Sequence, residues 1–290
     1  MTRHLAAFGL YLTAALAQSG VQAPRAGCLL GANGSLRPVY GVAGAFLADV
    51  PATTGAISAA CSDSLALVKT ATSIEVRDSN LQLLAQWDAP PGAALFALPR
   101  TGQTAFAYYP ATGELVQVGP QSAPRTVLDS ESLGGDSLAI ASPDALHLIA
   151  VVAGTPGPRL ARISVADGVV QTQTPLEDVA APLALLSDGT VVFADGVGLV
   201  IRPPGAAVQR LAQPVIHGNV RQEQSSVLAP TVRPVVTEQR MALPAPAAAS
   251  DQMGGRWLAV RLADGSAPMA LRLAGGGEQT CRVPAKETAP

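Results

Sequence analysis

Few residues in this 290-residue chain have the types and spacings that catalysis requires. The chain has three histidines, and the first, His4, belongs to an N-terminal apolar segment described below. His147 lies in an apolar run that predicts a β-strand, so an outward-facing or hydrogen-bonded structural role is expected for it. His217 lies between Val215-Ile216 and Gly218-Asn219, a context typical of a loop. His217 is therefore the candidate general base if the protein is an enzyme.

Other reactive groups offer little chemistry. Ser137, in Gly134-Gly135-Asp136-Ser137, lacks the Gly-x-Ser-x-Gly elbow of many serine hydrolases, and its glycines predict a turn. Lys69 is expected to face solvent from a strand. The chain carries no Cys-x-x-Cys, His-Glu-x-x-His, Walker or Gly-x-Gly-x-x-Gly motif. Neither a metal nor a cofactor is expected, and a hairpin turn suffices to explain the formal glycosylation acceptor Asn33-Gly34-Ser35.

The N-terminus has the three-part pattern of a secretory signal peptide. Arg3 and His4 precede an apolar run from Leu5 to Ala17, which ends on small residues before Gln18. That run is shorter than the roughly 20 residues of a membrane-spanning helix, and no comparable run follows. Residues 1–17 are therefore expected to be a signal peptide and residues 18–290 a single exported domain without a membrane span, periplasmic or extracellular. A lipid-modified Cys28 is the alternative, disfavoured by the nearby Arg25.

The composition favours many short strands joined by tight turns. Charged residues make up only 14% of the chain, and 28 glycines and 24 prolines are scattered along it. With 19 basic and 21 acidic residues intermixed, no basic stripe exists to neutralise a phosphate backbone, so nucleic-acid binding is not expected. Aromatic residues are 4% of the chain, which counts against a stacking platform for sugars or quinones.

Hairpin signals recur along the chain. Asp-Gly or Asn-Gly pairs flanked by aliphatic runs predict type I′ turns, in which both central residues have positive φ. These pairs are Asn33-Gly34, Asp167-Gly168, Asp188-Gly189, Asp195-Gly196 and Asp264-Gly265. Strand-turn-strand units beginning at Ile57, Leu95, Leu138 and Leu183 are spaced by about 40 residues, and each is followed by two further short strands. Four strands in about 40 residues predict one propeller blade.

Two segments carry a family resemblance. Ser142-Pro143-Asp144 before an apolar strand, and the run from Ser164 to Val170, resemble the repeats of bacterial β-propellers of the YVTN, TolB and WD40-like kind. The resemblance spans about residues 57–211 and departs from the pattern at Ala145, where those repeats usually carry glycine. It implies a disc of antiparallel blades around a central channel. The expected fold is therefore an all-β propeller of about six four-stranded blades, with seven as the alternative.

The two ends of the chain are expected to close the ring. Strands in residues 254–283 could share a blade with residues 28–50, which would pair otherwise exposed edges. Such closure would bring Cys28 close to Cys281, so these two are the expected disulfide. Cys61 is then expected to be a buried free thiol.

Three functions are compatible with these features. The favoured one is a non-enzymatic, monomeric scaffold that presents loops to a protein or envelope partner. The second is a propeller-type lyase or hydrolase that uses carboxylates and His217 at the central channel. The third is a structural surface protein with a separate β domain in residues 214–290.

Overall fold

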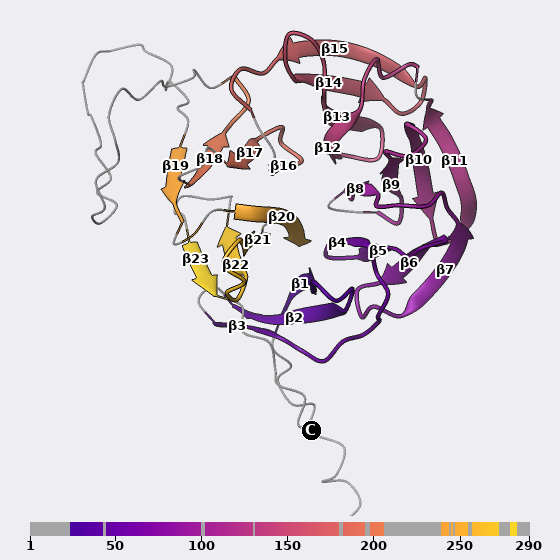
Figure 1. Ribbon diagram of the computed structural model, residues 1–290. Helices are drawn as coiled ribbons and strands as arrows, with labels where there is room; N and C mark the ends of the chain where they lie inside the picture. The colour runs from indigo at the N-terminus through magenta and orange to yellow at the C-terminus, as the bar shows by residue number, and fades with distance from the viewer. Residues whose placement is uncertain are drawn as a thin grey trace, which may run out of the picture.

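The computed structural model describes residues 24–42, 45–99, 102–129, 131–179, 182–194, 198–205, 239–243, 245, 247–254, 257–272 and 279–282. Throughout these ranges the regular structure is β, with 23 strands in six antiparallel sheets and no helix. Figure 1 shows the sheets arranged like blades around a centre. The prediction of an all-β propeller with about six blades is confirmed.

Each sheet is formed by strands that follow one another in the sequence. The first sheet contains β1 (Arg25–Leu30), β2 (Leu36–Val42) and β3 (Ala45–Ala48). The second contains β4 (Ser58–Cys61), β5 (Leu65–Lys69), β6 (Ser73–Asp78) and β7 (Leu83–Asp88). The third contains β8 (Leu95–Ala97), β9 (Ala105–Tyr109), β10 (Glu114–Gly119) and β11 (Ser122–Leu128). The fourth sheet contains β12 (Ser137–Ala141), β13 (His147–Val152), β14 (Arg159–Ser164) and β15 (Val169–Pro175). The fifth contains β16 (Leu183–Leu185), β17 (Val191–Ala194), β18 (Gly198–Arg202) and β19 (Gln239–Ala242). The sixth contains β20 (Ala247–Gly254), β21 (Trp257–Leu262), β22 (Met269–Arg272) and β23 (Gln279–Arg282). The strands that begin the second to fifth sheets lie within one residue of the four repeat starts predicted from the sequence.

Packing between neighbouring blades explains the hydrophobic pattern. The second strand of a blade is covered on both faces, so β5 and β9 are buried along their whole length, and both are apolar except for Lys69 at the end of β5. The outermost strand β15 is mostly exposed and correspondingly polar. Six buried clusters lie between consecutive sheets. One of them joins the first sheet to the last and places Phe46 of β3 edge-on against Trp257 of β21, with ring centroids 4.6 Å apart.

The Asp-Gly turns differ from the type I′ prediction. Gly168, Gly189 and Gly265 have positive φ. Among the described non-glycine residues, however, positive φ occurs at Leu81 and Asp178, not at the aspartates of these turns. The Asp188 carboxylate instead accepts a hydrogen bond from the backbone N–H of Thr190 at 2.8 Å. This is the pattern of a longer loop with glycine in the left-handed position after a type I turn, so the hairpins form with a different turn.

The first strand of the first sheet runs opposite to the first strand of the second sheet. Strands β4 and β8 are parallel, because Ser58 at the start of β4 accepts a hydrogen bond from Ala94 just before β8. In contrast, Gly34, which follows β1, accepts a hydrogen bond from Ala56, which precedes β4. Strand β1 is therefore antiparallel to β4 and corresponds to the second strand of a complete blade.

The two ends of the chain form separate sheets rather than the shared blade expected from the sequence. Within the described part of the chain, β20 completes a four-stranded sheet with β21–β23, and the first sheet has three strands. Strands β4 and β20 contact each other at the position where a first strand of the first sheet would lie, and β1 contacts both. Sheet-to-sheet packing, rather than strand pairing, therefore brings the ends together.

The described C-terminal strands pack against the preceding blade. Strand β19 pairs with β18 of the fifth sheet. Leu258 and Leu271 of the last sheet pack in one cluster with Val192 and Leu199 of the fifth. The C-terminal strands thus share their core with the preceding blade.

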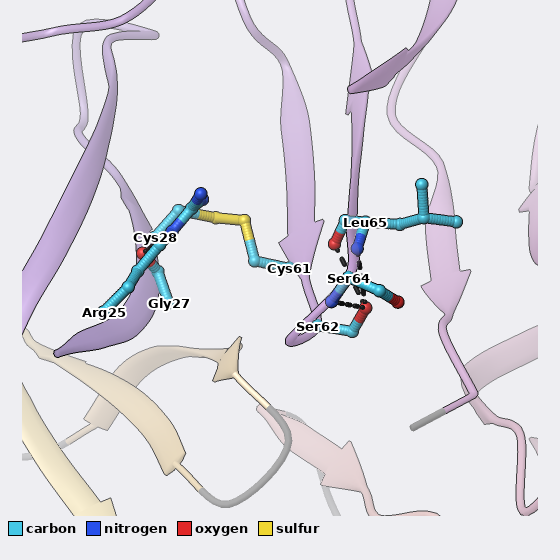
Figure 2. Close-up of a disulfide and its surroundings, with 7 residues drawn as sticks. All are labelled: Arg25, Gly27, Cys28, Cys61, Ser62, Ser64 and Leu65. Carbon is cyan, nitrogen blue, oxygen red and sulfur yellow. Dashed lines mark hydrogen bonds between the residues drawn. A yellow bond between two sulfur atoms is a disulfide. The ribbon is translucent and has the colours of Figure 1, made fainter. Parts of the chain in front are cut away.

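The predicted disulfide between Cys28 and Cys281 is wrong. Cys28 of β1 is bonded to Cys61 of β4, with 5.9 Å between their Cα atoms (Figure 2). The antiparallel arrangement of β1 and β4 brings the middle of β1 beside the end of β4, which makes Cys61 the neighbour of Cys28. The bonded Cys28 sulfur is also unable to carry a lipid thioether. A disulfide is compatible with an oxidising compartment. The proposed signal peptide, residues 1–17, lies outside the described residues.

Candidate functional site

Of the two histidines considered from the sequence, the structure describes only His147. His217 lies outside the described residues. His147 is exposed at the start of β13, and its Nδ1 lies 3.0 Å from the Asp144 carboxylate. Asp144 also accepts hydrogen bonds from the backbone N–H groups of Leu146 and His147. Desolvation raises the pKa of Asp144, but the hydrogen bonds from Leu146 and His147 and the His147 side chain together outweigh it, so the pKa is lowered.

Ser142 lies beside this pair but does not complete a catalytic triad. Its hydroxyl donates to the backbone carbonyl of Asp144 and, at 3.2 Å, to that of His147. A nucleophilic serine must instead donate to the imidazole that will take its proton. The Ser-Pro-Asp turn is therefore held together by its own polar side chains.

Other residues considered from the sequence are also structural. Ser137 is buried and donates to the carbonyl of Ala139 at 3.3 Å. The Asn33 side-chain oxygen accepts hydrogen bonds from both the backbone and the hydroxyl of Ser35, as the hairpin interpretation requires. Lys69 was expected to face solvent, but the structure buries it completely, with Nζ donating to the carbonyl of Thr70 at 2.6 Å. Burial lowers the pKa of Lys69.

The first strands around the centre are composed mainly of small and aliphatic residues. The four strands β4, β8, β12 and β16 carry no ionisable side chain other than the bonded Cys61. Strand β20 contributes Asp251, and β1 contributes Arg25. Arg25 thus places a positive charge on β1, beside the join between the first and second sheets.

A cavity of about 290 Å³ lies at that join. Its lining comes from the start of β1, the β4–β5 turn and the β6–β7 turn, and consists of Arg25, Gly27, Ser62, Asp63, Ser79 and Asn80. Figure 2 shows Arg25 and Gly27 beside the Cys28–Cys61 bond. The disulfide therefore links the two strands that flank the cavity.

A β-bulge directs Arg25 toward this cavity. The register of β1 against β2 shifts between Arg25 and Gly27, so two residues of β1 oppose one residue of β2. Without the bulge, Ala26 would share a face with Cys28. In the structure Ala26 packs with Leu29 against the last sheet, and Cys28 packs against the second. The extra residue therefore moves Arg25 onto the face that meets the second sheet.

The Arg25 guanidinium is only partly satisfied. Its Nε donates to the carbonyl of Gly27 at 3.3 Å. The terminal nitrogens Nη1 and Nη2 are shielded from solvent and have no hydrogen-bond partner, and no salt bridge joins Arg25 to a described carboxylate. Burial lowers the pKa of Arg25, whereas Tyr40 and Asp78 act in the opposite direction. Because arginine stays protonated at neutral pH, the site contains a buried positive charge with unused donors.

Two rigid turns form the opposite wall. The Ser62 hydroxyl donates to the carbonyl of Leu65 and accepts from its backbone N–H, which leaves Asp63 exposed at the tip. In the second turn the Asp78 carboxylate accepts hydrogen bonds from the N–H groups of Asn80 and Gln82. Leu81 between them has a φ of 61° and is buried in the cluster that contains the disulfide. A bulky residue in this conformation is uncommon, so tertiary packing must hold the turn in place.

Sequence reasoning missed this site. In the sequence, Arg25 argues only against lipid modification of Cys28. The one sequence signal was an isolated arginine followed two residues later by glycine at the start of a strand, which is compatible with a bulge. The direction of β1, which brings the turns of the second sheet to Arg25, has no local signature.

Comparisons with known proteins support the fold. No family model matches the chain, and no curated protein does. A chain of the nidogen/laminin complex is similar in structure, with a TM-score of 0.53 at 15% identity over 86% of this chain and 90% of that one. Hydrazine synthase from Kuenenia stuttgartiensis gives 0.46 at 12% identity, over 82% and 70% of the two chains. Hsv2 from Kluyveromyces lactis gives 0.43 at 8% identity, over 87% and 82%. The resemblance to β-propeller repeats is confirmed at the level of the fold.

Within the described residues, no group of three histidine, cysteine, aspartate or glutamate side chains comes together in a way that could hold a metal ion. That part of the chain also contains no helix long and apolar enough to span a membrane.

Proposed function

We propose that this protein is an exported, non-enzymatic binding scaffold. Residues 18–290 form one propeller domain whose ring is closed by the N- and C-terminal parts of the chain. The domain acts as a monomer and uses the loops at the Arg25 end of its first two blades to bind a protein or envelope partner.

The cavity beside Arg25 carries this proposal. Of the polar groups discussed above, those of the Ser-Pro-Asp turn satisfy one another, whereas the Arg25 terminal nitrogens do not have partners. A preformed recess with a few convergent polar groups is typical of a binding site. The recess lies at the loop ends of a rigid sheet pair that a disulfide links, and binding residues are commonly placed on loops held by such a scaffold.

Site-specific photo-crosslinking tests the proposal in the cell that produces the protein. A photoreactive residue replaces Asn80 at the cavity rim or, as the matched control, the exposed Thr172 on the outer strand β15. We expect one defined adduct from position 80 and none from position 172. Equal labelling at both positions, or none at either, would contradict a partner at this end of the propeller.

A further inference from the structure

We propose that the cavity between the first two blades binds a carboxylate group, which the Arg25 guanidinium recognises. The inference rests on the proposed function, because it names the chemistry that the scaffold recognises in its partner. The group is carried either by a small free acid or by a glutamate or aspartate side chain of a peptide.

The unused donors of Arg25 are the first reason. A buried donor without a partner is less favourable than one that is hydrogen-bonded, and the penalty is larger when the donor is charged. The structure leaves Nη1 and Nη2 of Arg25 in this state, although Nε is bonded to Gly27. A ligand that supplied an acceptor to each terminal nitrogen would remove this cost. The two oxygens of a carboxylate match the planar guanidinium fork in this way.

The nearby acids do not supply those acceptors. One oxygen of Asp78 is held by two backbone N–H groups of its own turn. Asp63 lines the cavity but is exposed at the tip of the β4–β5 turn, and it forms no salt bridge with Arg25. The charge of Arg25 is therefore not neutralised by a hydrogen-bonded or ion-paired acid among the described residues.

The remaining lining favours a singly charged group over phosphate. Ser79 and Asn80 provide a hydroxyl and an amide that can donate to an anion. Asp63 lies in the same lining, and Asp78 is close enough to act on the charge of Arg25. A phosphate dianion has twice the charge of a carboxylate ligand, so Asp63 and Asp78 would repel it more strongly. A carboxylate can bind the Arg25 guanidinium with less repulsion from these acidic side chains.

The cavity also has a fixed shape. The disulfide joins β1 to β4, and the buried side chain of Leu81 anchors the β6–β7 turn in the same cluster. Fixed walls reduce the entropy lost on binding. The volume of about 290 Å³ suits a small acid or one acidic side chain rather than a large ligand.

Titration calorimetry and thermal unfolding test the inference with the oxidised chain. The probes are sodium acetate, sodium succinate, inorganic phosphate and a terminally blocked Gly-Glu-Gly peptide, each at ionic strength matched with sodium chloride. We expect saturable binding of at least one carboxylate probe and weaker binding of phosphate. Preference for succinate or acetate indicates a free acid, and preference for the peptide indicates an acidic side chain of a protein partner.

Two variants separate the site from general charge effects. Arg25→Gln is expected to weaken carboxylate binding about tenfold or more, because it removes the charged fork. Arg162→Gln removes an exposed arginine on β14 and is expected to leave binding unchanged. Arg25→Lys keeps the charge without the fork and is expected to bind with intermediate affinity. Circular dichroism and the presence of the Cys28–Cys61 bond verify that each variant is folded.

Several outcomes would overturn the inference. They are the absence of saturable binding by any carboxylate probe, equal binding by folded Arg25→Gln, and tighter binding of phosphate than of every carboxylate. The photo-crosslink from position 80 distinguishes this failure from that of the scaffold proposal. If the partner adduct persists in the Arg25→Gln background, the scaffold remains and the carboxylate site is wrong.

Discussion

Burial shifts the pKa values of individual side chains in this propeller, and the neighbouring sequence does not predict these shifts. Tyr109 is the last residue of the fully buried strand β9, and it lies opposite Glu114 of the neighbouring strand β10. Desolvation, assisted by Glu114, raises its pKa to about 12. The folded state therefore keeps a proton on this phenol at a pH at which the unfolded chain, with a tyrosine pKa of about 10, releases it.

This difference predicts a loss of stability at alkaline pH. Between about pH 10 and 12 the folded state binds more protons than the unfolded state, so the free energy of unfolding falls as pH rises. We expect the fall attributable to Tyr109 to approach about 1 kcal/mol per pH unit, and Tyr109→Phe to remove it. Urea unfolding at pH 9, 10 and 11 measures the slope. Glu114→Gln should reduce it by less, and parallel curves for wild type and Tyr109→Phe would contradict the assignment.

At the scale of the elements, the direction of β1 decides the covalent connectivity. Because β1 runs antiparallel to β4, Cys28 lies beside Cys61 and the disulfide closes a loop between residues 33 positions apart. In the chain-entropy treatment such a loop contributes at most about 4 kcal/mol. The bond joins two neighbouring sheets and does not connect the ends of the chain.

Cysteine variants test this connectivity. We expect the double variant Cys28→Ser, Cys61→Ser to lose up to about 4 kcal/mol of unfolding free energy. Cys281→Ser serves as the matched control and should retain the stability of the wild type. A reducing agent should bring the wild type close to the double variant. Peptide mapping under non-reducing conditions should recover Cys28 linked to Cys61, and recovery of Cys28 linked to Cys281 would contradict the structure.

At the scale of the whole molecule, packing at every sheet interface should make the ring unfold as a unit. Phe46 contributes to the interface between the first and last sheets, and Phe193 is equally buried in the interface between the fourth and fifth. Both side chains are almost inaccessible to solvent, so truncation of either removes comparable apolar contact.

Truncating each phenylalanine to alanine tests this cooperativity. We expect Phe46→Ala and Phe193→Ala each to lower the free energy of unfolding by about 3–4 kcal/mol, in a single transition. Thermal and urea unfolding followed by two spectroscopic probes measure this. If Phe46→Ala only accelerates hydrogen exchange in β1–β3 and leaves the main transition unchanged, the first sheet is a loosely attached unit and the ring does not unfold cooperatively.

Local patterns in the sequence determined the strands and their grouping into blades. Apolar runs within β5 and β13 predicted buried strands, and glycine-containing turns separated them. The repeat of about 40 residues predicted the starts of four blades within one residue. These properties depend on contacts between residues close in sequence, because each sheet is made of consecutive strands. They could therefore be inferred without knowledge of how the blades face one another.

The tertiary structure decided what lies between blades. The partner of Cys28, the complete burial of Lys69 and the meeting of Arg25 with Ser79 and Asn80 all depend on segments from different strands or sheets. A bulge at the start of β1 and the reversed direction of that strand set the geometry around Cys28 and Arg25. Neither leaves a strong local pattern, because strand direction is set by packing across sheets. The candidate binding site is for this reason a property of the fold that only the three-dimensional arrangement reveals.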